Sequence, residues 1–252
     1  MRLRALTCGW LTGDAASLVA GEPGRLRVPV PCFLVDHPAG LVLFDSGLHP
    51  ATMRDPALGM GRAAPAFVPE LGDDEDVTGR LRALGVAPAD VRWLVTSHLH
   101  FDHVGGHAGI PNATLVVQRG EWDAAHDDTQ AHALFYERHL WDLGHGVRVV
   151  DGEHDLFGDG RVVCLPTPGH TPGHQSLRVR GDDGRSVVLT ADACYLRRTL
   201  EEGRLPPLAW SHDAMRASLA RLRALRAGGA TLVYGHDPDC WAAVPQAPAP
   251  LL

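Results

Sequence analysis

Three histidines and one aspartate lie within six positions of the segment 97–106, which reads SHLHFDHVGG. His98, His100 and Asp102 alternate along the chain, so an extended segment would direct them to one side. A turn after Asp102 would aim His103 at the same point from another direction. Imidazole and carboxylate groups together suit zinc, iron, manganese or cobalt. Because four such groups are too many for one catalytic ion that must keep open positions, the segment predicts two adjacent ions that share it.

Three further residues of ligand type occur in matching positions along the chain. His170 follows the apolar run RVVCL, Asp192 ends the run VVLTAD, and His236 follows TLVYG. Each of these runs predicts a strand, and a strand end is a rigid place from which a loop can hold a functional side chain. The carboxylate of Asp192 can bridge two metals with its two oxygens. We interpret the remaining histidines as ordinary surface or core residues.

Other chemistries have weaker support in the sequence. There is no G-x-S-x-G motif, so a serine-hydrolase elbow is not indicated. The segment GMGRAA from Gly59 imitates a dinucleotide fingerprint, but no strand precedes it, and we expect a loop. Cys194 lies between Asp192 and Tyr195, where a small buried side chain needs no catalytic role.

Composition limits the class of protein. The 252 residues carry a formal net charge of −7, and all 23 basic residues are arginine, which removes lysine from any mechanism. The acidic balance with dispersed arginines disfavours nucleic acid, and no apolar run approaches the roughly 20 residues of a membrane helix. Five scattered cysteines predict no disulfide framework and a cytoplasmic location. The length predicts a single domain spanning 1–252.

Apolar runs and turn residues predict alternating strands and helices. The predicted strands are the N-terminal segment and residues 28–36, 41–45, 91–96, 114–118, 147–150, 161–165, 175–180, 186–190 and 231–234. The predicted helices are 78–84, 129–140 and 213–227, the last with Met215, Leu219, Leu222 and Leu225 on one face. The proline-rich tail VPQAPAPLL is expected to lie extended on the surface. This order indicates layered sheets with helices outside them.

At these motifs the chain resembles the metallo-β-lactamase superfamily, whose signature is H-x-H-x-D-H with later His, Asp and His ligands. It is most similar to the N-acyl homoserine lactonase branch, in which segments like SHLHFDHVGG, TPGHTPGHQSL, LTADACY and GHD occur in this order. The segment VPVPCFLVDHPAGLVLFDSG also looks like the N-terminal strands of that branch. The resemblance therefore extends from about residue 28 to residue 236.

The resemblance implies an α/β fold, a four-layer αβ/βα sandwich with a dimetal site along one edge of the paired sheets. It assigns His98, His100 and His170 to the first ion and Asp102, His103 and His236 to the second, with Asp192 and a hydroxide bridging both. Two divalent ions per chain are implied, zinc before cobalt, manganese or iron. A homodimer is expected on the same basis.

The resemblance also implies roles for residues around the ions. Asp45, in the D-S-G motif, would orient a ligand histidine, and His174 would be structural and not a ligand. Tyr195 would help the substrate carbonyl or the leaving oxygen, so that Tyr195, Asp102 and Asp192 are the catalytic candidates. His107 departs from the branch, which often has asparagine there. Apolar candidates for an acyl-chain pocket, with a surface or core role as the alternative, are Met60, Phe67, Leu208 and Trp210.

The implied reaction is hydrolysis of the lactone ring of N-acyl homoserine lactones, the signals of bacterial quorum sensing. Two ions would lower the pKa of a bridging water from about 15.7 towards 7, and no covalent enzyme intermediate would be needed. One alternative is a metallohydrolase for another lactone or ester, such as a pyridoxolactone, an aryl ester or a phosphotriester. Another is a non-catalytic metal-binding or redox protein with a di-iron centre.

Overall fold

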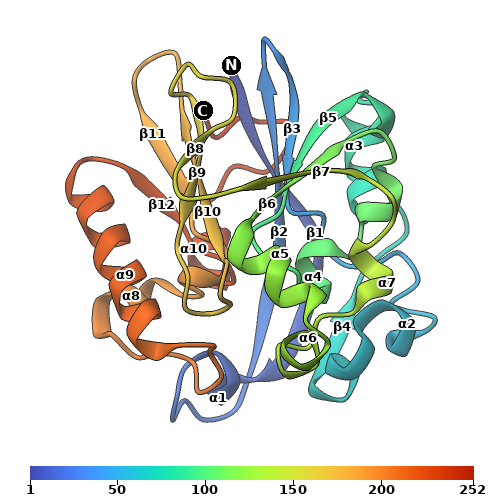
Figure 1. The fold of residues 1–252 in the computed structure, drawn as a ribbon, viewed down its shortest axis with the longest axis vertical. Helices are drawn as coiled ribbons and strands as arrows, with labels where there is room; N and C mark the ends of the chain where they lie inside the picture. Colours follow the sequence, from blue (N-terminus) through green and yellow to red (C-terminus); the bar gives the residue numbers. More distant parts are fainter.

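The computed structural model describes residues Met1–Leu252 and contains two β-sheets (Figure 1). The larger sheet has seven strands. The pairs β4–β1, β1–β2 and β2–β3 are antiparallel, and the pairs β3–β5, β5–β6 and β6–β7 are parallel. In spatial order they are β4 (Phe67–Glu70), β1 (Arg2–Asp14), β2 (Arg25–His37), β3 (Gly40–Phe44), β5 (Val91–Val95), β6 (Thr114–Gln118) and β7 (Gly146–Val150).

The smaller sheet has five strands, antiparallel except for the β11–β12 pair. In spatial order they are β12 (Thr231–Val233), β11 (Ser186–Leu189), β10 (Gln175–Arg180), β9 (Val162–Pro166) and β8 (His154–Asp155). These strands are short. They are rich in valine and leucine because they are covered on both faces.

Helices cover the outer face of each sheet (Figure 1). The larger sheet is covered by α3 (Val77–Ala83), α5 (Arg119–His126) and α7 (Arg138–Trp141), and the smaller by α8 (Arg197–Glu202) and α9 (His212–Ala227). The shorter helical segments are α1 (Ala15–Leu18), α2 (Pro56–Met60), η1 (Gly61–Ala66), η2 (Pro88–Asp90), α4 (Phe101–Val104), η3 (His107–Gly109), α6 (Asp128–Ala133), η4 (Ala191–Ala193) and α10 (Pro238–Trp241). None of the helices has the length and apolarity needed to cross a bilayer.

Three apolar clusters fill the three interfaces between these four layers. The central one joins Phe33 and Phe44 of the larger sheet to Leu177 of the smaller. A second lies between the larger sheet and α3, and a third between the smaller sheet and α9, where Met215 and Leu222 are fully buried. The predicted αβ/βα sandwich is therefore confirmed, and so is the apolar face of α9.

The predicted strands are present with ends shifted by no more than a few residues, but several local predictions were wrong. The predicted helix 129–140 is split into α6 and α7, because Phe135 adopts a φ of +58° that a helix cannot continue. The expected loop at Gly59 is helical instead, within α2 and η1. Neither α5 nor the short strands β4 and β8 was predicted. The C-terminal tail does run extended along β1, where the Leu251 N–H donates to the Leu3 carbonyl.

Candidate metal centre

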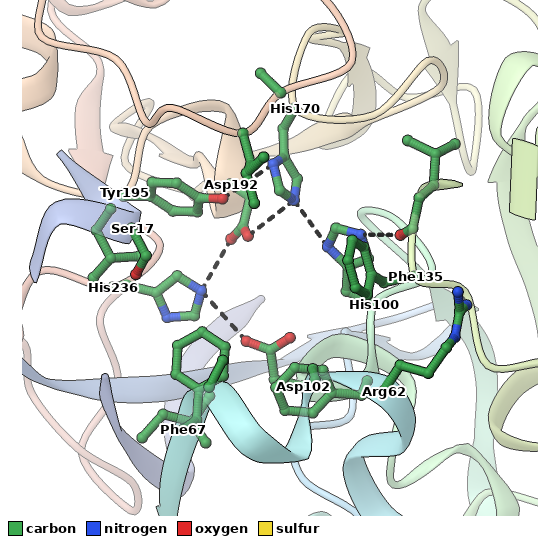
Figure 2. A pocket seen from close by; sticks show the side chains of 18 of the residues that line it. Ser17, Arg62, Phe67, His100, Asp102, Phe135, His170, Asp192, Tyr195 and His236 are labelled. Atoms are coloured by element: carbon green, nitrogen blue, oxygen red, sulfur yellow. Dashed lines mark hydrogen bonds and ion pairs between the residues drawn. The ribbon is translucent and has the colours of Figure 1, made fainter. Parts of the chain in front are cut away.

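All the predicted ligand residues come from one edge of the sandwich. His98 and His100 follow β5, His170 follows β9, Asp192 lies in η4 after β11, and His236 follows β12. The residues that follow β5, β9, β11 and β12 therefore converge, as His100, His170, Asp192 and His236 do in Figure 2. One detail of the sequence prediction was wrong. The chain is not extended through Asp102, because α4 begins at Phe101 and a helical turn carries Asp102 and His103 to the site.

The ligand atoms form two groups, within each of which they lie no more than 4.8 Å apart. The first group is His98, His100 and His170 with Asp192, and the second group is Asp102, His103 and His236. Apart from Asp192, which the resemblance implies is shared by both ions, these are the groupings that the resemblance implies.

Asp192 lies between the groups and presents one oxygen to each. Its Oδ2 is 3.3 Å from His170 Nε2, whereas its Oδ1 is 3.1 Å from His236 Nε2 and 3.3 Å from His103 Nε2 (Figure 2). This arrangement matches a carboxylate that bridges two cations.

Two atoms at the centre of the site lack hydrogen-bond partners. His103 Nε2 and Asp192 Oδ1 are buried and have no hydrogen-bond partner, although an unpaired buried polar group costs about 1–3 kcal/mol. Burial lowers the pKa of His98 and His170 well below the usual histidine value, so both are neutral and each offers a nitrogen lone pair. Neutral imidazoles and carboxylates converging without cysteine fit two divalent ions.

The outer nitrogen of each ligand-type histidine is held by a nearby oxygen. The pairs are His98 Nδ1 with Ser97 Oγ at 3.0 Å, His100 Nε2 with Leu134 O at 2.7 Å, His103 Nδ1 with Asp45 Oδ2 at 2.9 Å, His170 Nδ1 with the Tyr195 hydroxyl at 3.0 Å and His236 Nδ1 with Pro29 O at 2.8 Å. Carbonyl and carboxylate oxygens only accept, so the nitrogens of His100, His103 and His236 that face them donate. Their other nitrogens face the site, and in the neutral imidazole each of these carries the lone pair that a metal ion would take.

Comparison with known proteins agrees with this geometry. Residues 25–236 match the metallo-beta-lactamase superfamily. The chain is 38% identical over 237 residues to the N-acyl homoserine lactonase AttM of Agrobacterium fabrum, covering 90% of this chain and 89% of that protein. The chain belongs to the metallo-β-lactamase superfamily.

Further similarities within the superfamily extend over nearly the whole chain. It is 29% identical over 218 residues to the N-acyl homoserine lactonase AiiA of Bacillus thuringiensis subsp. kurstaki, covering 85% and 84% of the two chains. The fold superposes with a TM-score of 0.87 on an N-acyl homoserine lactone hydrolase solved with the product N-hexanoyl-L-homoserine at its catalytic metal centre. That match has 27% identity and covers 99% of this chain and 98% of the other.

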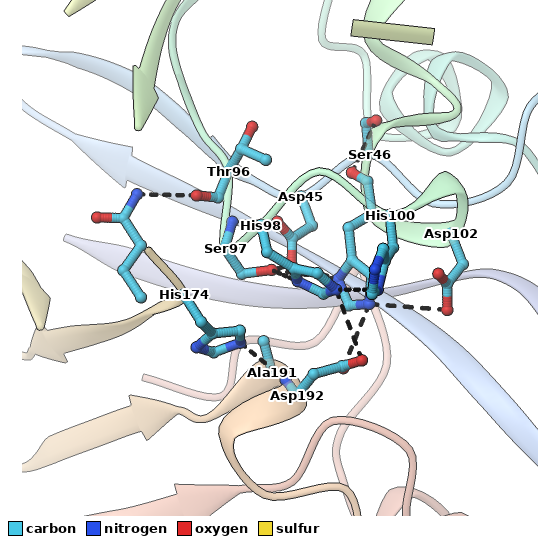
Figure 3. Close-up of polar contacts among 12 residues, drawn as sticks. Asp45, Ser46, Thr96, Ser97, His98, His100, Asp102, His174, Ala191 and Asp192 are labelled. Atoms are coloured by element: carbon cyan, nitrogen blue, oxygen red, sulfur yellow. Dashed lines mark hydrogen bonds and ion pairs between the residues drawn. The ribbon is translucent and has the colours of Figure 1, made fainter. Parts of the chain in front are cut away.

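Asp45 is hydrogen-bonded to a histidine of the second group. Its Oδ1 accepts the Ser97 N–H at 2.7 Å, and its Oδ2 lies 2.8 Å from Ser97 Oγ and 2.9 Å from His103 Nδ1 (Figure 3). Asp45 adopts a φ of +58°, an uncommon conformation for a residue with a side chain. The carboxylate therefore contacts a ligand-type histidine, as the role that the resemblance implies for Asp45 requires. Ser97, which the sequence analysis did not select, contacts both Asp45 and His98.

His174 and His107 support the site without joining either group. His174 Nε2 accepts the backbone N–H of Asp192 at 3.1 Å, so its Nδ1–H donates to Thr167 Oγ1 at 2.9 Å. His107 lies between Ser46 Oγ at 2.7 Å and Thr96 Oγ1 at 3.0 Å. Burial lowers the pKa of each of these histidines to about 3, so both are neutral.

A cavity of about 510 Å³ opens directly onto the two groups (Figure 2). His100, Asp102, His170, Asp192, Tyr195 and His236 form its polar floor, and most of its other lining residues are apolar.

Of the residues predicted for an acyl-chain pocket, Phe67, Leu208 and Trp210 line the cavity, but the prediction for Met60 was wrong. Met60 is fully buried in the apolar cluster beneath the site, where it packs in the core. Leu134 and Phe135, which the sequence analysis did not select, also line the cavity because of the break between α6 and α7.

Cys194 has no catalytic environment. It is fully buried, its thiol donates to the Leu196 carbonyl at 3.3 Å, and burial raises its pKa well above the usual value for a thiol. The reactive form of cysteine is the thiolate, which this environment suppresses.

Proposed function

We propose that this protein is a dimetal hydrolase that opens the lactone ring of N-acyl homoserine lactones, and so quenches quorum signals. The observation that carries the proposal is a deep, mostly apolar cavity whose floor is the pair of ligand groups joined by Asp192. An acyl chain suits the apolar walls, and a lactone suits the polar floor. The similarity to lactonases from Agrobacterium and Bacillus supports this substrate class.

The first ion would be held by His98, His100 and His170, the second by Asp102, His103 and His236, and both by Asp192. We propose zinc as the metal, since nitrogen and carboxylate ligands suit it, with cobalt, manganese and iron as alternatives to be tested by metal analysis. When bound, such ions polarise a carbonyl oxygen and lower the pKa of a shared water.

Tyr195 is proposed to donate a hydrogen bond to the lactone. The His170 nitrogen that faces Asp192 needs its lone pair for a metal, so the Nδ1–H donates to the Tyr195 oxygen 3.0 Å away. Burial and the charges of Asp192 and Asp102 raise the pKa of Tyr195 well above its usual value. The hydroxyl therefore keeps its proton and can direct it to the carbonyl oxygen or the ring oxygen of a substrate in the cavity.

Asp192 and Asp102 are the two carboxylates proposed to take part in the reaction, by supplying negative charge and by moving a proton. Both carboxylates lie in the cavity floor, and Asp102 Oδ2 is 3.6 Å from His236 Nε2. Asp192 or a bound water would return the proton taken from the attacking water to the ring oxygen as the C–O bond breaks. Phe67, Leu208 and Trp210 would bind the acyl chain and exclude water from the ring.

A substrate panel tests this proposal. The metal-loaded protein should hydrolyse N-acyl homoserine lactones with a higher kcat/KM than a pyridoxolactone, an activated aryl ester or a phosphotriester. A preference for one of the other substrates would replace the proposed substrate class, and no hydrolysis of any of them would favour the non-catalytic alternative.

We also propose that residues 1–252 fold as a single domain, that the protein is a homodimer and that it acts in the cytoplasm. The five cysteines are all free, which suits a reducing compartment. A monomer mass in solution at micromolar concentration would refute the dimer, and fractionation of cells that express the protein tests the location. Limited proteolysis tests the domain, since two domains would give a stable fragment from cleavage between them.

A further inference from the structure

Glu121, in the first turn of α5, is a fully buried carboxylate with four hydrogen-bond donors. Its Oε1 accepts the Leu99 N–H at 3.0 Å and the Tyr136 hydroxyl at 2.5 Å. Its Oε2 accepts the Thr171 hydroxyl at 2.7 Å and the Gly173 N–H at 3.1 Å. Both oxygens are thus occupied, and none of these donors belongs to α5.

Three of these donors lie in the two loops that carry the histidines of the first group, and the fourth, the Tyr136 hydroxyl, comes from the segment between α6 and α7. Leu99 lies between His98 and His100, and Thr171 follows His170 directly. One carboxylate therefore joins loops that are about 70 residues apart in the chain. The second group is held differently, since Asp45 and the Pro29 carbonyl orient its histidines.

The loop after His170 is in close contact with the helix that carries Glu121. A side-chain carbon at Gly173 would overlap the backbone of Glu121, so only glycine permits this approach. The contact brings the Gly173 N–H to Glu121 Oε2. Small changes at Glu121 are therefore expected to move the His170 loop.

Burying a carboxylate in a protein core is energetically unfavourable. Removing a charge from water costs several kcal/mol, and an apolar side chain of similar volume often stabilises such a position as well or better. Glu121 is kept away from water and is paired with neutral donors, not with an arginine. Its arrangement is explained by the need to hold two separate loops at a fixed distance.

We propose that Glu121 is a positioning residue for one metal ion. It holds the His98–His100 loop and the His170 loop at the separation that the first ion requires, and it has little effect on the second ion. The proposal rests on the dimetal site of the proposed function.

The test measures the affinity of each ion separately. In a His236→Ala background, the first group stays intact, whereas in a His170→Ala background the second group does. Glu121→Gln is added to each, and Zn²⁺ affinity is measured by competition with a chromophoric chelator. Glutamine has the size of glutamate, but its NH2 group must face either the Leu99 or the Gly173 N–H, which then loses its acceptor.

We expect Glu121→Gln to weaken Zn²⁺ binding 10- to 100-fold in the His236→Ala background, the usual effect of losing a residue that supports a ligand. In the His170→Ala background the change should be less than about threefold, well below that range. The matched control is Asp155→Asn, because Asp155 also accepts several backbone N–H groups, those of Phe157, Gly158 and Gly160, in a turn without ligand residues. It should leave both affinities unchanged.

Equal weakening in both backgrounds, or an effect no larger than that of Asp155→Asn, would overturn the proposal. If Glu121→Gln does not fold, Thr171→Val removes one donor and should weaken the first ion alone, and an unchanged first ion would count against the proposal. A wild-type protein that binds two ions but opens no lactone would overturn the proposed function and leave this result standing.

Discussion

Asp192 connects the two ligand groups, because its oxygens face different sets of histidines. His174 fixes the Asp192 backbone through the N–H that it accepts, so the carboxylate has little freedom to turn. A carboxylate in this place supplies negative charge to both ions, which an amide of the same shape cannot do.

Asp192→Asn should therefore weaken both ions and lower kcat/KM by at least about a hundredfold. Metal analysis after gel filtration, together with lactone hydrolysis, measures both effects. Retention of two tightly bound ions in Asp192→Asn would show that the carboxylate does not bridge them.

At saturating Zn²⁺, Tyr195→Phe should keep both ions bound and the fold intact, because Tyr195 belongs to neither ligand group and its ring is retained, although His170 Nδ1–H loses its acceptor. Loss of a dedicated oxyanion donor costs up to about 3–4 kcal/mol. Since the ions would carry much of the charge, we expect roughly 1–2 kcal/mol, a five- to thirtyfold drop in kcat/KM. The drop should be larger for lactones than for an activated aryl ester, whose leaving group needs little help. An unchanged lactone rate would make Tyr195 a packing residue.

At the scale of elements, the ends of strands made the site predictable. His98, His170, Asp192 and His236 each follow an apolar run, and this position, together with their ligand-type side chains, predicted that they belong to one site. Glu121 could not be found in this way, because it lies in a helix with an unremarkable sequence and its partners come from distant loops. Met60 was misplaced because an apolar residue in a short helix carries no sign of whether it faces a cavity or the core.

His107 links the ends of two strands, through Ser46 after β3 and Thr96 after β5. Its pKa is about 3 in the folded protein and about 6.5 when unfolded, so unfolding takes up a proton between these values. Stability is therefore lost as the pH falls from about 6.5 towards 3, by up to about 1.4 kcal/mol per pH unit.

His107→Asn removes this titration, so its unfolding free energy should fall less steeply with pH than that of the wild type. Urea unfolding of the two metal-free proteins at several pH values between 4.5 and 6.5 measures the difference in slope. Parallel curves would mean that His107 is not a buried neutral histidine.

At the scale of the whole molecule, three apolar interfaces hold four layers together and keep the strand ends at one edge. The layers were predictable because most strands and the helix α9 carry a distinct apolar pattern, whereas the short strands β4 and β8 do not. The long helix predicted at 129–140 was wrong because α6 ends in a local cap, in which Phe135 is left-handed and the Tyr136 N–H donates to the Ala131 carbonyl. Glycine usually marks such a cap, and a phenylalanine there gives no sign of it.

Leu222→Ala in α9 should cost about 2–5 kcal/mol of unfolding free energy, because its side chain is fully buried against the smaller sheet. Leu225→Ala, at a half-buried position of the same helix, is the matched control and should cost less. Denaturant unfolding measures both. Equal costs at the two positions would contradict the packing of this layer.

The central claim is that two ions held by the groups around Asp192 open a lactone. The most direct measurement follows kcat/KM for an N-acyl homoserine lactone while metal-free protein is titrated with Zn²⁺. We predict almost no activity without metal and a rise that is complete only at two ions per chain. Full activity in the metal-free protein, or a plateau at one ion that a second ion does not change, would contradict the account.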